Sequence, residues 1–93
     1  MGGLVQFSNF MFQVYILKSA KSGKYYIGHT HDLDARLFRH NNGQVKSTKS
    51  NLPWEVIYVE KYSTKSEAYR REFEIKSYKS GIRFKKLLGL WKE

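Results

Sequence analysis

The fold is decided by residues 13–28, whose sequence is QVYILKSAKSGKYYIG. Two short runs of β-branched and aromatic residues, 14–17 and 25–27, favour strands, because such side chains pack well on a pleated surface. The link between them contains two serines and Gly23, which are typical of a turn. This stretch therefore predicts a β-hairpin near the N-terminus of the chain.

A first helix is expected directly after the hairpin. Thr30 is expected to cap its start, and the apolar residues Leu33 and Leu37 lie about one turn apart within it. Gly43 supplies a left-handed stop at its end. The stretch that follows, residues 44–53, is rich in Lys, Ser, Thr and Asn and has no apolar period, so it is predicted to be a basic polar loop.

The rest of the chain predicts one strand and two helices. Residues 54–61 alternate in polarity as a third strand. Thr64 and Glu67 have the spacing of a capping box, which opens a helix that continues to about Tyr78. Gly81 separates this helix from a last short helix around residues 82–88. The order β-β-α-β-α-α predicts an α+β fold, with a small three-stranded antiparallel sheet flanked by helices.

The composition fits a single domain held together by its core alone. The chain has 93 residues, of which 41% are hydrophobic, and this leaves room for one core. It contains no cysteine, so disulfides and thiolate metal sites are excluded. We expect an N-terminal extension at residues 1–12, the folded domain at 13–88 and a C-terminal tail at 89–93.

The charge of the chain is strongly positive. Seventeen Lys and Arg residues against eight Asp and Glu give a net charge of +9. An enzyme for a neutral substrate has no need of such a field, so a polyanionic partner is expected. The longest uncharged stretch, residues 1–13, is too short and polar to span a bilayer and lacks the basic start of a signal peptide. We therefore expect a cytoplasmic protein without membrane association.

One carboxylate of the second helix is predicted to face the core. On a helical wheel, Glu72 falls in the middle of an arc of apolar residues that is expected to pack inward. This arc consists of Ala68, Tyr69, Phe73 and Ile75. Burying an unpaired carboxylate is costly, so Glu72 requires a proton, a cation or a metal ion. A buried pair with Lys76, four residues on, or with an Arg or Tyr of a strand is one explanation, and a metal-binding or catalytic role is the other.

The first helix and the hairpin carry a second group of polar side chains. Arg36 and His40 lie four residues apart and share a face of the helix. Arg36 suits bidentate phosphate binding, and His40 can move a proton near neutral pH. A solvated basic helix end explains the same pair, so both interpretations stay open. Tyr15 and Tyr26 are expected on one face of the hairpin, where they serve either packing or chemistry.

The two remaining histidines carry less information. His29 and His31 form a His-x-His pair in a chain without cysteine. A zinc site needs three or four protein ligands, and no useful spacing supplies the others. We therefore expect both histidines at the surface.

Together these positions resemble the GIY-YIG nuclease superfamily. The matching residues are Val14-Tyr15, Tyr26-Ile27-Gly28, Thr30, Asp32-Leu33, Arg36, His40-Asn41 and Glu72. The resemblance covers about residues 13 to 88 and is closest to small stand-alone bacterial proteins made of this domain alone. These proteins in turn resemble the N-terminal nuclease domain of the UvrC-type excinuclease subunit. The segments 46–49, 53–55 and 64–68 are similar to that single-domain group in particular.

The resemblance implies a metal-dependent endonuclease that hydrolyses phosphodiester bonds, with DNA as the expected substrate and a role in repair or processing. Glu72 would be the sole protein ligand of one divalent ion, Mg²⁺ or Mn²⁺. Arg36 would hold the scissile phosphate, and a tyrosine or a neighbouring histidine would help to activate water. The catalytic residues implied in this way are Tyr15, Tyr26, Arg36, His40 and Glu72.

Further residues are assigned to binding and to architecture. Expected nucleic-acid contacts come from Arg36, Arg39, Lys46, Ser47, Thr48, Lys49 and Lys76. Gly28 is expected to allow close approach of a strand and a helix, while Thr64 and Glu67 shape the start of the second helix.

Two alternatives remain open at this level. The superfamily's usual late Asn has no counterpart, since the last Asn of this chain is Asn51. A nucleic-acid-binding module of the same fold, without useful turnover, is therefore the alternative function, and the basic loop favours it. A third possibility, a domain that acts through protein contacts, rests on the apolar residues Phe7, Phe10, Met11 and Phe12.

Overall fold

A three-stranded sheet forms the centre of the molecule. The computed structural model describes residues 11–91. Its strands are β1 (Phe12–Ser19), β2 (Tyr25–Thr30) and β3 (Trp54–Tyr62), and they pair antiparallel in the order β2-β1-β3. The predicted α+β class and the N-terminal hairpin are therefore confirmed. Both hairpin strands are longer than expected, and β2 in particular continues past Ile27 to Thr30.

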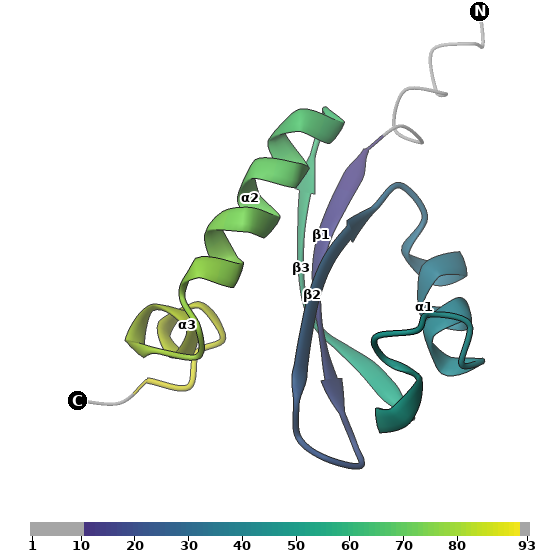
Figure 1. The fold of residues 1–93 in the computed structure, drawn as a ribbon. Coiled ribbons are helices and arrows are strands. Elements are labelled where there is room, and N and C mark those ends of the chain that lie inside the picture. The colour runs from purple at the N-terminus through teal and green to yellow at the C-terminus, as the bar shows by residue number, and fades with distance from the viewer. Residues whose placement is uncertain (1–10, 92–93) are drawn as a thin grey trace, which may run out of the picture.

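Helices cover both faces of this sheet. The helices are α1 (Leu33–Asn41), α2 (Lys65–Ser77) and α3 (Ile82–Leu87), with a short 3₁₀ turn, η2 (Lys49–Asn51), inside the basic loop. Figure 1 shows α2 and α3 on one face of the sheet and α1 on the other. The strand β2 lies at one edge of the sheet, so side chains from either face can meet around it.

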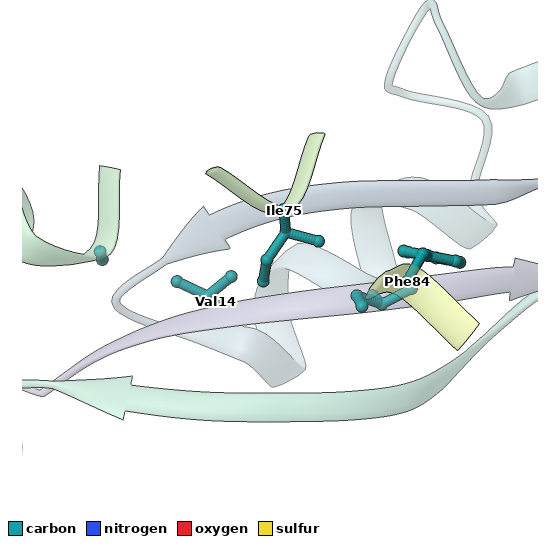
Figure 2. Packing of buried hydrophobic residues seen from close by; sticks show 5 residues of the cluster. Val14, Ile75 and Phe84 are labelled. Carbon is teal, nitrogen blue, oxygen red and sulfur yellow. The ribbon is translucent and has the colours of Figure 1, made fainter. Parts of the chain in front are cut away.

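Each face has its own apolar cluster. Val14 and Ile16 of β1 pack against Ile75 of α2 and Phe84 of α3, as Figure 2 shows in part. On the opposite face, a second cluster contains Tyr15, Leu17, Trp54, Tyr26, Leu33 and Leu37. Successive residues of a strand point to opposite faces, so β1 supplies both clusters in turn. This alternation places Tyr15 on the α1 face.

The helix ends follow the capping signals closely, with one exception. The Thr64 hydroxyl accepts a hydrogen bond from the Glu67 amide at 3.2 Å, as the capping box predicts. Gly43 ends α1 in the left-handed region, at φ +72°. The prediction that Thr30 caps α1 is wrong, because the Asp32 carboxylate accepts from the Ala35 amide at 3.1 Å. Thr30 instead accepts from the Asp32 amide and so shapes the turn before the helix.

The predicted inner face of α2 is rotated in the structure. Ala68 and Ile75 are fully buried as expected, but the side chains of Tyr69 and Phe73 are 60% and 69% exposed. Between these two exposed residues, Arg71 turns toward the sheet and forms an ion pair with β3. The arc expected to pack inward was therefore half correct, and Tyr69 and Phe73 lie at the surface.

The Arg71 ion pair joins α2 to β3. Its guanidinium donates to both oxygens of Glu60, at 2.8 and 2.9 Å. The hydroxyls of Tyr58 and Tyr62 also donate to this carboxylate. These hydrogen bonds lower the pKa of Glu60 to about 2, and the bond from Arg71 has the largest effect. The next residue, Glu72, contacts His29 of β2, so neighbouring residues of α2 hold the helix to both edge strands of the sheet.

Replacing Glu60 by glutamine is expected to lower stability and to change its pH dependence. A carboxyl whose pKa is lowered on folding adds stability above its unfolded pKa, near 4.5, and loses it as pH falls toward the folded value near 2. The contribution at neutral pH is on the order of 3 kcal/mol. In urea unfolding, the gap between wild type and Glu60→Gln should shrink from pH 6 to pH 3. A gap that stays constant over this range would contradict the assignment.

The apolar residues near the N-terminus, on which the expected protein-contact role rests, fall only partly within the described residues. Phe7 and Phe10, which motivated a protein-contact role, lie outside the described residues. Phe12 belongs to β1 and packs against the α2-side cluster, so its side chain serves the core. Within residues 11–91, none of the helices has the length and apolar character that crossing a bilayer requires.

Candidate active site

Four of the five predicted catalytic side chains meet on the α1 face of the sheet. Tyr15 and Tyr26 come from neighbouring strands, with their ring centroids 6.3 Å apart. The ring of His40, from α1, lies 6.0 Å from Tyr15 and 4.9 Å from Tyr26. Arg36 lies one turn earlier on α1, and its guanidinium is close enough to Tyr15 to perturb the pKa of the phenol. The hairpin and α1 therefore assemble one cluster.

A chain of hydrogen bonds runs inward from Tyr15. The Tyr15 hydroxyl lies 3.0 Å from Nε2 of His40, and Nδ1 of His40 lies 2.9 Å from the Thr48 hydroxyl. Thr48 donates its own proton to the Val45 carbonyl, so it accepts from His40. This network assigns the proton of neutral His40 to Nδ1 and leaves Nε2 to accept from Tyr15.

Burial sets the protonation of both groups. It raises the pKa of the Tyr15 phenol to about 12, although Arg36 acts in the opposite direction. It also lowers the pKa of His40 to about 4, with help from the charges of Arg36 and Arg39. The His40 ring is therefore neutral at neutral pH, because its burial beside two cations disfavours the charged form.

Gly28 leaves room for the phenol of Tyr15 to lie over β2. It faces Tyr15 across the β1–β2 pair, and a Cβ atom built at Gly28 would lie 2.7 Å from the Tyr15 hydroxyl. Any larger residue would push the phenol away from this position. The glycine therefore serves close approach, but of a strand to a tyrosine rather than of a strand to a helix.

Glu72 approaches the same strand from the opposite face. Its two carboxylate oxygens lie 2.5 Å from Nδ1 of His29 and 2.5 Å from Nζ of Lys76. The Glu72 side chain is only 13% exposed, which agrees with its predicted inward position. The expected pair with Lys76 is present, and His29 is a second partner. The charge of Glu72 also raises the pKa of Tyr15, although its effect is the smallest of the several causes.

A basic hollow lies at the edge strand β2 and is lined by Arg36 from one half of the site and by His29, the partner of Glu72, from the other. It has a volume of about 280 Å³ and receives side chains from both helices that flank the strand. Its lining residues are Phe12, His29, Thr30, His31, Arg36, Arg39 and Lys65. Arg36, Arg39 and Lys65 carry permanent positive charge, so the hollow is suited to a phosphate group.

The donor set around Glu72 is compatible with a divalent ion of the magnesium type. No group of three His, Cys, Asp or Glu side chains with metal-binding geometry occurs among the residues that the structure describes. Mg²⁺ does not need such a group, because it keeps several waters and binds through one or two carboxylates plus substrate phosphate. The largely buried Glu72 carboxylate already contacts the His29 ring and the Lys76 ammonium. A single ion on this carboxylate would replace Lys76 or His29 at one of the two oxygens, whereas a structural zinc site lacks the ligands among the described residues.

The predicted nucleic-acid contacts divide into two groups. Arg39, Lys46, Ser47, Lys49 and Lys76 are exposed, and Arg36 is half-buried beside the hollow. Thr48 is fully buried, so its hydroxyl cannot touch a nucleic acid in this structure. Its backbone carbonyl accepts from the Trp54 indole at 2.8 Å. Thr48 therefore belongs to the support of His40 rather than to a binding surface.

The residue that sequence reasoning missed is His29. It was expected at the surface, yet its ring is only 20% exposed and contacts Glu72. The alternation of β2 places Tyr25, Ile27 and His29 on the α2 face, and this pattern would have predicted the burial of His29. The prediction missed it because the strand was expected to end at Ile27. His31, two residues on, is exposed as expected.

Replacing Thr48 by valine is expected to disturb His40 without touching the surface. Valine keeps the shape but leaves the Nδ1 proton of a buried ring without an acceptor, which costs about 1–3 kcal/mol. We expect this loss in urea unfolding, together with a changed tautomer signal of His40 in ¹⁵N NMR. Ser50→Ala, on the exposed part of the same loop, is the control and should change neither. Unaltered His40 resonances in Thr48→Val would contradict the assigned tautomer.

Comparison with known proteins places this geometry in a family context. The model of the GIY-YIG catalytic domain matches residues 11–85. A UPF0213 protein of Staphylococcus epidermidis is 50% identical over 66 residues, which span 70% of this chain and 79% of the relative. A UPF0213 protein of Staphylococcus saprophyticus is 46% identical over the same shares of the two chains.

A solved structure agrees with the fold. The solution NMR structure of a UPF0213 protein from Bacillus halodurans is 33% identical, with a TM-score of 0.55. The match covers 86% of this chain and 84% of that one. The name UPF0213 specifies no reaction.

Proposed function

Because the chain belongs to the GIY-YIG catalytic domain family, we propose that it is a metal-dependent endonuclease that hydrolyses DNA phosphodiester bonds. The family is of the nuclease type, and its substrates are therefore nucleic acids. The observation that carries the finer proposal is that one basic hollow at the edge strand β2 is lined by Arg36, which acts on Tyr15, and by His29, which contacts Glu72. We propose residues 13–88 as the nuclease domain and 89–93 as a tail.

Arg36 is proposed to bind the scissile phosphate. Its guanidinium lines the hollow, and hydrogen bonding of the guanidinium to the Tyr15 oxygen raises the Arg36 pKa, so Arg36 remains a cation throughout the working pH range. A planar fork of donors matches two phosphate oxygens and stabilises the extra negative charge of the transition state. Arg39 and Lys65, at the rim of the same hollow, would orient the neighbouring backbone.

Tyr15 and His40 are proposed to act on the attacking water. With a pKa near 12, Tyr15 is protonated at neutral pH and is not itself a free base. His40 is neutral and accepts the Tyr15 hydrogen bond through Nε2. The phenol oxygen is thereby left with its lone pairs toward the site, where it can accept from water. Tyr15 is proposed to position that water for attack, and His40 to hold the phenol in the required orientation as a neutral hydrogen-bond acceptor.

Glu72 is proposed to hold one divalent ion, Mg²⁺ or Mn²⁺. The bound ion would supply positive charge for the phosphate and for the leaving oxygen. His29 orients the Glu72 carboxylate through Nδ1, and Tyr69 contacts the His29 ring with its edge. These contacts keep the carboxylate at the edge of β2 rather than free in solvent.

The proposal is tested by incubating the full chain with labelled supercoiled, flapped, branched and single-stranded DNA, in Mg²⁺, Mn²⁺ or EDTA. We expect cleavage only in the presence of a divalent ion, and preferentially on a branched or flapped structure. Residues 11–91 contain no separate reading element such as a zinc finger or helix-turn-helix, so discrimination by shape rather than by sequence would support a repair or processing role.

The alternative is a nucleic-acid-binding module of the same fold. The specific observation in its favour is the exposed basic segment formed by Lys46, Ser47 and Lys49. Such a module would bind DNA with an affinity that falls steeply with salt, because phosphate contacts release counterions. Saturable binding without cleavage of any substrate in the panel, in either metal, would favour this function over the nuclease.

A further inference from the structure

The helix α2 presents an exposed stripe of aromatic and basic side chains. Lys65, Tyr69, Phe73 and Lys76 lie at a spacing of about one helical turn, so they share one side of the helix. The rings of Tyr69 and Phe73 are 60% and 69% exposed. The Lys76 side chain is 52% exposed, even though it pairs with Glu72. We call these four residues the α2 stripe.

The α2 stripe is continuous with the candidate active site. The ring of Tyr69 meets His29 edge-on, with centroids 6.0 Å apart, and His29 bonds Glu72. Lys65, at the start of the stripe, lines the basic hollow that also receives Arg36. A strand of nucleic acid that lies in the hollow therefore reaches the two rings without leaving the protein surface.

The chemistry of the α2 stripe fits unpaired nucleotides. Proteins bind single strands by stacking bases on aromatic side chains while cations follow the phosphates. Paired bases inside a duplex hide their faces in the stack, so only an unpaired base can lie on Tyr69 or Phe73. Single exposed apolar residues are common on protein surfaces. Two aromatic rings one turn apart, bounded by lysines and beside a candidate catalytic carboxylate, form a more specific arrangement.

We propose that the α2 stripe binds unpaired nucleotides next to the cleavage site, with bases stacked on Tyr69 and Phe73 and phosphates along Lys65 and Lys76. This inference rests on the proposed nuclease function and specifies its substrate class as a strand with a single-stranded arm. A protein partner is the competing occupant, a second copy of this chain included. The charge disfavours a second copy, because each chain carries +9 and lysines bound the rings.

The test is a binding titration in EDTA, in which cleavage does not intervene. The probes are a labelled single strand, a blunt duplex of the same sequence and a fork that contains both. We expect Tyr69→Ala and Phe73→Ala each to weaken binding to the single strand and the fork by about 5-fold or more. Binding to the blunt duplex should change by less than about 2-fold, because duplex affinity rests on phosphate contacts.

Matched variants separate stacking from general effects. Phe73→Leu keeps an apolar side chain but loses the flat ring, so it should weaken binding as Phe73→Ala does. Tyr69→Phe keeps the ring and should bind as wild type. Phe38→Ala is the control, because Phe38 is 66% exposed on α1 and does not line the hollow. Circular dichroism of every variant checks that the fold is kept.

Three outcomes would overturn the inference. They are unchanged single-strand binding in both alanine variants, equal weakening on strand and duplex, and a shift from dimer to monomer in sedimentation with unchanged binding. The last outcome would identify the α2 stripe as a contact between copies. Cleavage in Mg²⁺ by the same variants is measured separately, so failure of this inference is distinguishable from failure of the nuclease proposal.

Discussion

Glu72→Gln is expected to abolish cleavage while DNA binding survives. Glutamine keeps the size of the side chain but removes the charge that a divalent ion requires. Loss of the ion's stabilisation of the transition state amounts to several kcal/mol, which is at least about 1,000-fold in rate. Binding should persist, because the substitution removes a negative charge from a protein whose net charge is +9. The measurement is the single-turnover rate in Mg²⁺, together with a binding titration in EDTA.

Glu55→Gln is the matched control for this substitution. It makes the same change in charge on an exposed position of β3, away from the hollow. We expect Glu55→Gln to cleave at the wild-type rate. A loss of cleavage in Glu72→Gln would then result from the position of Glu72 in the site and not from the change in the net charge of the protein. Equal cleavage by Glu72→Gln and wild type would remove Glu72 from the reaction, and would point to a contaminating nuclease if it also occurred in EDTA.

Arg36→Lys is expected to lower the cleavage rate by about 100-fold to 1,000-fold, the range found when one donor to a developing oxyanion is lost. Lysine retains the positive charge but not the planar fork, so it cannot hold two phosphate oxygens at once. DNA affinity should change little, and its dependence on salt should be unaltered, because the number of cationic contacts is the same. The contrast between a slow reaction and normal binding identifies a group that acts in the transition state.

The control for Arg36 is Arg70→Lys on the solvent side of α2. Arg70 is exposed and donates to Ser66 one turn earlier, so its replacement tests the general effect of exchanging arginine for lysine. We expect cleavage and binding close to wild type. If Arg36→Lys cut as fast as Arg70→Lys, then Arg36 would supply only general positive charge, and the assignment of the scissile phosphate to it would fail.

The elements that could be predicted from the sequence are those decided by local chemistry. The hairpin, the capping pair Thr64 and Glu67, and the left-handed Gly43 depend on residues a few positions apart, and each is present. Spacing also identified the family, because the tyrosines, Arg36 and Glu72 keep a fixed pattern along the chain. The predicted cluster of Tyr15, Tyr26, Arg36 and His40 follows from that pattern.

Contacts between distant segments could not be predicted in the same way. His29 and Glu72 are 43 residues apart, and they meet only because β2 lies at the edge of the sheet beside α2. Arg71 and Glu60 are 11 residues apart, and no local period reveals their ion pair. A prediction from hydrophobicity alone therefore placed Tyr69 and Phe73 on the inner face of α2, whereas both are exposed. The burial of His40 likewise follows from the loop that carries Thr48 over α1.

The same distant contacts connect stability with the proposed chemistry. The Arg71–Glu60 pair fixes α2 on the sheet, and Glu72 is the next residue along the helix. Thr48 holds the ring that accepts from Tyr15. Substitutions at these supporting positions should therefore lower both the free energy of unfolding and the cleavage rate, whereas Arg36→Lys should lower only the rate.

The central claim is most directly tested by titrating Mg²⁺ into wild-type protein that is saturated with branched DNA, and measuring the cleavage rate at each concentration. The account predicts no product in EDTA and a rate that rises to a plateau as Mg²⁺ fills one site. Product formed at the same rate in EDTA, or no product at any Mg²⁺ or Mn²⁺ concentration while the DNA remains bound, would contradict it.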